Sequence, residues 1–162
     1  MPDLLVKLYE LPDLAPHLER ARASGIAIRR AIAPEKHVVT AWIAEHFSEF
    51  WKSEAEVAFA RAPISLWVAT RDARCVGFCC YDTSARGFYG PVGVDENERG
   101  SGLGTALSLA VFHDMRAQGY GYGVIGWAGP VAFYEKIVGA TVIPGSEPGI
   151  YKGMLRPTPS SE

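Results

Sequence analysis

The sequence predicts an α/β fold of the α+β type, with one mixed, mostly antiparallel sheet flanked by helices. Residues 88–94 read as a strand that passes through an acidic, glycine-rich turn into an amphipathic helix at 102–118. Residues 64–70 and 76–82 read as a hairpin, and the strand at 88–94 extends it into a meander. With 162 residues, 48% of them hydrophobic, the chain can bury one core and is too short for two.

We expect a single domain over residues 1–155, followed by a frayed tail at 156–162. The first core strand is placed at residues 26–32. Residues 1–24 precede it and read as an amino-terminal extension made of one strand and one helix. The expected role of this extension is an extra packing layer or a dimer surface.

Two helices are predicted between the first core strand and the hairpin. Pro34 can occupy the first turn of the first helix, and apolar residues then repeat at helical spacing up to Phe47. Ser53 and Glu56 form a capping-box pattern for a second, short helix that ends near Arg61. The elements expected after the central helix are a strand at 122–127, a short helix from 129–130 to Gly139, and strands at 140–143 and 150–155.

Composition indicates a protein of the reducing cytoplasm that binds neither nucleic acid nor membranes. The net charge is −2 and the sequence has no basic run, whereas both partners require clustered Lys and Arg. The amino-terminal stretch has Asp3 where a signal peptide needs positive charge. Cys75, Cys79 and Cys80 lie within or beside one strand, where neighbouring residues point to opposite faces, so buried and reduced thiols are expected.

The glycine-rich turn predicts an anion site. Glycines at 100, 102 and 104 remove side chains where the helix begins, so several backbone N–H groups and the helix dipole can act on one anion, such as a phosphate. A Walker loop would need Lys and then Ser or Thr after Gly104, but Thr105 and Ala106 follow. A dinucleotide fold would need a further glycine at position 105 and an acidic ribose partner about twenty residues on, and neither is present.

The pattern resembles the GNAT superfamily of acyl-CoA-dependent N-acyltransferases, whose motif is Gln/Arg-x-x-Gly-x-Gly/Ala after a strand. Arg99, Gly102 and Gly104 fit this motif. The second part of the signature is an aromatic pair in a short helix that ends at a glycine. It corresponds here to Phe133 and Tyr134, with Gly139 closing the helix. The resemblance covers about residues 63–155 and implies a sheet that is splayed between the fourth and fifth core strands.

The resemblance implies acetyl-CoA as the co-substrate and involves no metal. Backbone N–H groups of the loop would bind the pyrophosphate, and the pantetheine arm would pair with the strand before it. Pro91 and Gly93 agree with such a split, because both weaken strand pairing. The implied cofactor-binding residues are Val92, Gly93, Val94, Arg99, Gly100, Ser101, Gly102, Leu103, Gly104, Thr105 and Phe133.

The resemblance also implies two catalytic groups. The N–H of Val94 matches the oxyanion donor, and Tyr134 matches the general acid that protonates the leaving sulfur. The alternative for Tyr134 is a core aromatic residue. No residue stands out as the base: Asp95 and Glu96 follow the strand, but they are also typical of surface charges near a helix start.

The acceptor would lie under the two helices that precede the hairpin, where Trp51 and Glu54 are candidate contacts together with Phe47 and Glu56. Trp127 occupies a position where the family often has Asn, and it is a further candidate. The predicted activity is acetyl transfer to a primary amine of a small molecule or peptide, by direct attack in a ternary complex. The alternative is a GNAT-like module that senses acyl-CoA without turnover. Family members often form dimers, so a homodimer is an expected assembly.

Overall fold

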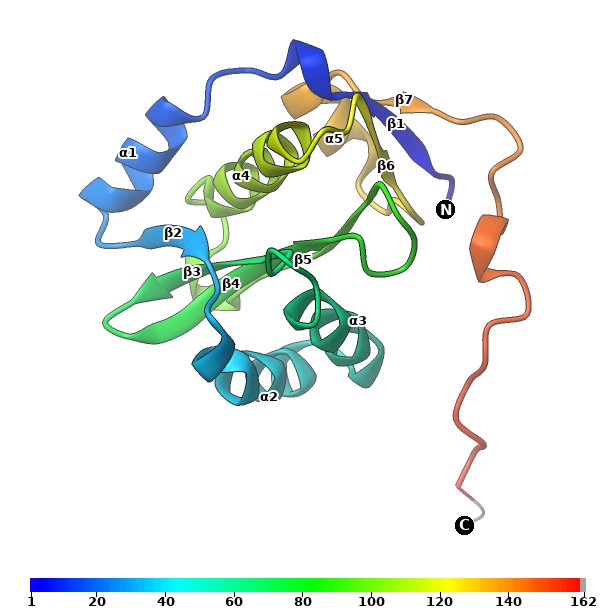
Figure 1. Ribbon diagram of the computed structural model, residues 1–162, viewed down its shortest axis with the longest axis horizontal. Coiled ribbons are helices and arrows are strands. Elements are labelled where there is room, and N and C mark those ends of the chain that lie inside the picture. Colours follow the sequence, from blue (N-terminus) through cyan, green and yellow to red (C-terminus); the bar gives the residue numbers. More distant parts are fainter. Residues whose placement is uncertain (161–162) are drawn as a thin grey trace.

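The computed structural model describes residues 1–160. Its seven strands form one sheet with the order β2-β3-β4-β5-β6-β1-β7 (Figure 1). The strands are β1 (Leu4–Lys7), β2 (Ala27–Arg30), β3 (Leu66–Arg71), β4 (Arg74–Tyr81), β5 (Phe88–Val94), β6 (Tyr122–Ile125) and β7 (Thr141–Val142). All neighbouring strands are antiparallel except β5 and β6, which are parallel. The mixed, mostly antiparallel sheet predicted from the sequence is therefore confirmed.

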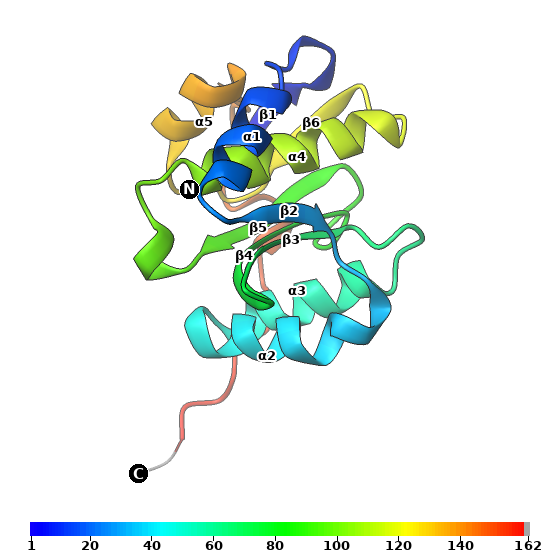
Figure 2. The same ribbon diagram turned by 90° about the vertical axis from the view of Figure 1, so that its left-hand side faces the viewer.

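Helices cover both faces of this sheet. They are α1 (Ala15–Ala23), α2 (Lys36–His46), α3 (Glu49–Phe59), α4 (Leu103–Ala117) and α5 (Val131–Val138). Helices α1 and α4 lie on one face and α2 and α3 on the other (Figure 2). Cys79 belongs to the hydrophobic cluster under α4, whereas Cys80 belongs to the cluster under α2 and α3. Neighbouring residues of β4 thus face opposite sides of the sheet, as predicted.

The amino-terminal strand lies inside the sheet. Leu4 of β1 pairs with Ile125 of β6 on one side and with Val142 of β7 on the other. The side chains of Leu4 and Val6 are 0% exposed. Residues 1–24 do form a strand and a helix, but the expectation of an added packing layer or dimer surface is wrong for the strand. It is instead an interior strand, because its alternating apolar side chains fill the core.

The strand expected at residues 150–155 does not form. Gly149–Tyr151 is a single 3-10 turn, and residues 152–160 have no regular secondary structure. The ring of Tyr151 stacks on that of Trp127, with 4.8 Å between ring centroids. The expected tail at 156–162 falls in this irregular segment as far as residue 160, and residues 161–162 lie outside the described part of the chain.

The predicted capping box of the second helix is wrong. Helix α3 begins after Ser48, whose hydroxyl oxygen accepts a hydrogen bond from the N–H of Trp51 at 3.2 Å. Ser53 lies inside the helix, where its hydroxyl donates to the carbonyl of Glu49 at 3.0 Å. Ser-x-x-Glu is therefore an interior pattern here, because the true cap lies one and a half turns earlier.

Strands β5 and β6 part after two residue pairs. Phe88 pairs with Val124 and Tyr89 with Ile125, and the pairing ends there. On the other side of β5, the register with β4 shifts near Pro91, which agrees with the predicted bulge. Residues 90–94 of β5 are thus hydrogen-bonded on one side only. The predicted splay between the fourth and fifth core strands is confirmed.

Candidate active site

The glycine-rich loop presents a row of backbone donors. Gly100 and Gly102 adopt φ angles of 80° and 84°, and Gly102 is the N-cap of α4. Within residues 1–160, the N–H groups from Gly100 to Thr105 have no acceptor in the protein. Since these groups lie at the positive end of a fifteen-residue helix, the loop is suited to an anion.

The loop is held in place by interactions that leave these donors free. Asp95 accepts a hydrogen bond from the N–H of Asn97 at 2.8 Å. The guanidinium of Arg71, at the end of β3, contacts both carboxylate oxygens of Glu98 at 2.8 and 3.1 Å. The hydroxyl of Ser101 donates to the Glu98 carbonyl at 2.6 Å, so its proton is used within the loop.

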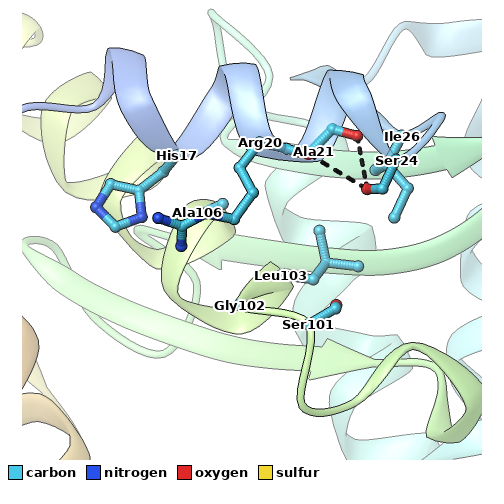
Figure 3. Close-up of a pocket in the computed structure, with 9 residues that line it drawn as sticks. All are labelled: His17, Arg20, Ala21, Ser24, Ile26, Ser101, Gly102, Leu103 and Ala106. Atoms are coloured by element: carbon cyan, nitrogen blue, oxygen red, sulfur yellow. Dashed lines mark hydrogen bonds between the residues drawn. The ribbon is translucent and has the colours of Figure 1, made fainter.

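Two arginines can add positive charge at this loop. The side chain of Arg20, on α1, extends over the start of α4 (Figure 3), and its Nη1 lies 3.6 Å from the position of a Cβ on Gly102. Neither Arg20 nor Arg99 forms an ion pair with a carboxylate in the described part of the chain. Arg99 is exposed at the loop surface.

The free edge of β5 continues from this loop. The N–H of Asp95 donates to the carbonyl of Val76 in β4 at 2.8 Å. Because alternate residues of an antiparallel ladder bond to the partner strand, the backbone N–H groups of Val92 and Val94 face away from β4, into the split. The Val94 side chain lies 3.9 Å from the position of a Cβ on Gly104, so the edge and the loop adjoin each other.

Gly93 has a different role from the one predicted for it. Its backbone polar groups face β4 by the same alternation, and a Cβ at this position would lie 2.5 Å from the ring of Phe47 and 2.8 Å from that of Phe78. The structure therefore does not bring Gly93 to the split. The absence of its side chain allows the aromatic cluster under α2 and α3 to pack against the strand.

A cavity of about 440 Å³ opens where β5 and β6 separate. Tyr134, Tyr89 and Val92 line it together. Tyr134 is 4% exposed, and burial raises the pKa of its hydroxyl to about 12. A tyrosine with this pKa keeps its proton at neutral pH, which a general acid requires. Phe133 does not line this cavity; its ring packs at 72° against that of Tyr134.

Tyr89 also lines this cavity, although no sequence motif marks it as a site residue. Its hydroxyl lies 2.6 Å from the hydroxyl oxygen of Ser108, which in turn donates to the carbonyl of Gly104 at 2.6 Å. Because Ser108 has only one hydroxyl proton and the carbonyl can only accept, Tyr89 is the donor to Ser108. The ring of Tyr89 packs edge-on against Tyr134, with 5.7 Å between centroids. Hydrogen bonding thus fixes Tyr89 between the glycine loop and the cavity.

The three predicted acceptor residues come together in the structure. Trp51, Glu54 and Trp127 all line the cavity at the split. They also line a second cavity of about 500 Å³, which shares Tyr151 and Ser84 with the first. Trp51 and Glu54 come from α3, and Trp127 follows β6. Tyr151 was not predicted as a site residue, because residues 150–155 were expected to form a strand.

The amino-terminal residues hold the turn that carries Trp127. The N–H of Trp127 donates to Asp3 Oδ1 at 2.9 Å, and the N–H of Ala128 donates to the Pro2 carbonyl at 2.9 Å. Trp127 has a φ of 53°, a left-handed conformation that is uncommon for a bulky residue and clusters at functional sites. The two residues directly before β1 therefore fix one wall of the acceptor cavity.

The other candidate residues lie elsewhere. Asp95 lies 4.0 Å from His46 and lines a separate recess beside α2 and the hairpin of β3 and β4. Phe47 is part of an aromatic cluster with Trp51, and Glu56 is exposed. Glu54 is therefore the carboxylate that the fold brings to the split.

The cysteines are free thiols, and two of them, Cys79 and Cys80, are buried. Burial raises the pKa of Cys75 to about 12 and that of Cys79 further still, which suppresses thiolate reactivity. Across residues 1–160, no three side chains of His, Cys, Asp or Glu are grouped closely enough to hold a metal ion. In the same range, no helix has the length and apolar character needed to cross a bilayer.

Comparisons with known proteins agree with this geometry. The model of the acetyltransferase (GNAT) family matches residues 30–140. No curated protein sequence matches the chain significantly. One similar solved structure contains the GCN5-related glucosamine N-acetyltransferase region of a fungal multi-domain GH3 β-N-acetylglucosaminidase. Its TM-score is 0.72 at 16% identity, over 88% of this chain and 19% of that one.

Two bacterial structures are similar as well. The GCN5-related N-acetyltransferase from Sphaerobacter thermophilus has a TM-score of 0.68 at 21% identity, over 88% of this chain and 48% of that one. The one from Kribbella flavida has a TM-score of 0.56 at 16% identity, over 87% and 53%. At such identities the likeness is one of fold. The chain spans about half the length of these two relatives, and a fifth of the fungal one.

Proposed function

Because the chain belongs to the GNAT acetyltransferase family, we propose that it transfers an acetyl group from acetyl-CoA to a primary amine of a small molecule or peptide. The observation that carries this proposal is the split between β5 and β6. Free backbone donors of Val92 and Val94 lie along one side of this split, and Val92 lines the same cavity as the buried, protonated Tyr134. An acyl transfer from a thioester needs a hydrogen-bond donor for the carbonyl oxygen and a proton donor for the leaving sulfur.

The loop and the free strand edge fit coenzyme A. The unpartnered N–H groups from Gly100 to Thr105 suit the pyrophosphate, and Gly102 leaves space for a close approach of the backbone. The free edge at Val92 and Val94 offers strand-like pairing to the amide groups of the pantetheine arm. When bound, acetyl-CoA would supply an activated acyl group at the end of that arm.

The protein groups would then serve one displacement. The amine nitrogen attacks the carbonyl carbon, a C–N bond forms and the C–S bond breaks. The N–H of Val94 stabilises the negative charge that develops on the carbonyl oxygen. Tyr134 donates its proton to the departing sulfur, and the proton that the attacking nitrogen loses passes to solvent water, from which Tyr134 regains one. No atom changes its oxidation state in this displacement, so no redox partner is needed.

Release of free thiol from acetyl-CoA, measured across a panel of amines, tests the proposed function. We expect release to depend on the amine and to yield one N-acetyl product per thiol, detected by mass spectrometry. Calorimetric titration with CoA provides the companion measurement. CoA binding without thiol release for every amine would identify a sensor module instead, and absence of CoA binding would exclude both functions.

Arg20→Ala is expected to weaken CoA binding by about three- to tenfold at low salt, and by less at high salt. The guanidinium lies at the positive end of α4 without a carboxylate partner among residues 1–160, so an incoming phosphate relieves its repulsion with the helix dipole. Calorimetry at two salt concentrations measures the effect.

Arg22→Ala is the matched control, because Arg22 is exposed and lies about 200° further around the same helix. Equal losses in the two variants would show that only the net charge matters.

A further inference from the structure

The two cavities at the split adjoin each other and share five lining residues. The inner cavity includes Val92 and the proposed general acid Tyr134, and the outer one includes Phe50 and Ile150. The residues that line both are Trp51, Glu54, Ser84, Trp127 and Tyr151. The two cavities therefore meet at three aromatic rings and one carboxylate.

Glu54 is the only acidic side chain that lines either cavity in the described part of the chain. Its Oε1 accepts a hydrogen bond from the hydroxyl of Ser84 and lies 3.2 Å from that of Thr83, which is also 3.1 Å from the carbonyl of Gly90 in β5. Within residues 1–160, Oε2 has no hydrogen-bond partner. The carboxylate is thus oriented through one oxygen and keeps the other available to a ligand.

The aromatic rings around this carboxylate are fixed. Trp127 and Tyr151 stack at 13°, and the turn that carries Trp127 is bonded to Asp3. Gly126 allows this packing, since a Cβ there would lie 2.5 Å from the hydroxyl of Tyr151. Trp51 of α3 lines both cavities as well. Rigid aromatic faces beside a single carboxylate bind an organic ammonium through cation–π attraction and an ion pair.

The outer cavity limits the rest of the acceptor. Phe50, Ile150 and Met154 give it an apolar lining, and among residues 1–160 its one charged contact besides Glu54 is Arg156. A second positive charge on the acceptor would thus meet apolar side chains and a like charge. This composition disfavours polyamines and lysine-rich peptides, and favours an uncharged apolar body that can pack against aromatic rings.

We propose that the acceptor is a monocationic primary amine with an aromatic body, whose ammonium is held by Glu54 between Trp51 and the stacked pair of Trp127 and Tyr151. This inference rests on the proposed acetyl transfer and names its acceptor class. Glu54 binds the ammonium and, as the one carboxylate that lines the cavity within residues 1–160, can accept the proton that the nitrogen gives up before attack.

The test compares 2-phenylethylamine, spermidine and a lysine-containing peptide in the thiol-release assay. We expect kcat/KM for 2-phenylethylamine to exceed those of the other two by about tenfold or more. Glu54→Gln should weaken binding of 2-phenylethylamine to the CoA-loaded protein by about 10- to 100-fold, measured by calorimetry, and leave CoA affinity unchanged. Glu56→Gln is the matched control, because Glu56 is exposed on the same helix.

A neutral probe separates charge from shape. 2-Phenylethanol has nearly the same body without the ammonium, so Glu54→Gln should not weaken its binding to the CoA-loaded protein. If spermidine or the peptide is the better acceptor, the acceptor class is wrong although the transferase activity stands. If no amine releases thiol, the proposed function fails, and calorimetry with 2-phenylethylamine still decides whether the cavity binds aromatic amines. Equal effects of Glu54→Gln and Glu56→Gln would overturn the role of Glu54.

Discussion

Tyr134→Phe is expected to lower kcat by about 10²- to 10⁴-fold while CoA affinity remains unchanged. The variant removes only the hydroxyl, and the ring keeps its contacts with Tyr89 and Phe133. The cofactor would be held by the glycine loop and the edge of β5, so its binding does not depend on this group. The hydroxyl matters when the thiolate leaves, because the sulfur then needs a proton.

The environment of Tyr134 adds a pH criterion to this prediction. Burial raises the pKa of Tyr134 to about 12, so the hydroxyl stays protonated below about pH 10. The wild-type rate should therefore show no alkaline loss from this residue up to that pH. Steady-state kinetics at saturating amine and titration with CoA provide the measurements. Tyr122→Phe is the control, since Tyr122 is exposed and remote from the cavity. Full turnover in Tyr134→Phe would show that water protonates the sulfur and that Tyr134 is a core aromatic residue.

Gly102→Val is expected to reduce CoA affinity by about 100-fold or more. The new side chain would stand at the N-cap of α4, where backbone N–H groups are to meet the pyrophosphate. Loss of two charge-assisted hydrogen bonds at about 1.5–3 kcal/mol each accounts for a change of this size. Calorimetric titration with CoA measures it, and thermal unfolding reports the cost to the fold.

A second glycine of the same helix provides a control for the stability that Gly102→Val loses. Gly102 has a φ of 84°, where a side chain costs about 1–2 kcal/mol. Gly119 follows the other end of the same helix, has a φ of 101° and has no atom within 4 Å of a Cβ position. Gly119→Val should therefore destabilise the protein to a similar extent and bind CoA normally. Normal CoA binding by Gly102→Val would remove the glycine loop from the cofactor site.

Local patterns predicted the elements that carry the chemistry. The glycine loop, the helix that follows it and the short helix with Tyr134 formed as predicted, because caps, breaks and apolar spacing are encoded over a few residues. Pro91 and Gly93 likewise indicated that β5 would be paired irregularly. The fold also brings Trp51, Glu54 and Trp127 to one cavity.

Long-range pairing was not predictable in the same way. Residues 4–10 alternate weakly, and nothing in them specifies β6 and β7 as neighbours. Residues 150–155 have the composition of a strand, yet Tyr151 stacks on Trp127 and the turn at Gly149 directs the chain out of the sheet. Nothing in the sequence indicated that Arg20 would lie at the glycine loop, since its place beside Gly102 depends on how α1 packs over α4. Such contacts depend on the completed core.

The interior position of β1 also has a consequence for the order in which the molecule can assemble. Asp3 is hydrogen-bonded to Trp127 and to Ser146, which lie 124 and 143 residues later in the chain. During synthesis the first strand leaves the ribosome long before β6 and β7 exist, and contacts of such separation form slowly. Until then Leu4 and Val6 have no partners, and the turn at Trp127 lacks its anchor. The nascent chain can thus form the hairpin of β3 and β4 early, while the acceptor cavity is among the last parts to take shape.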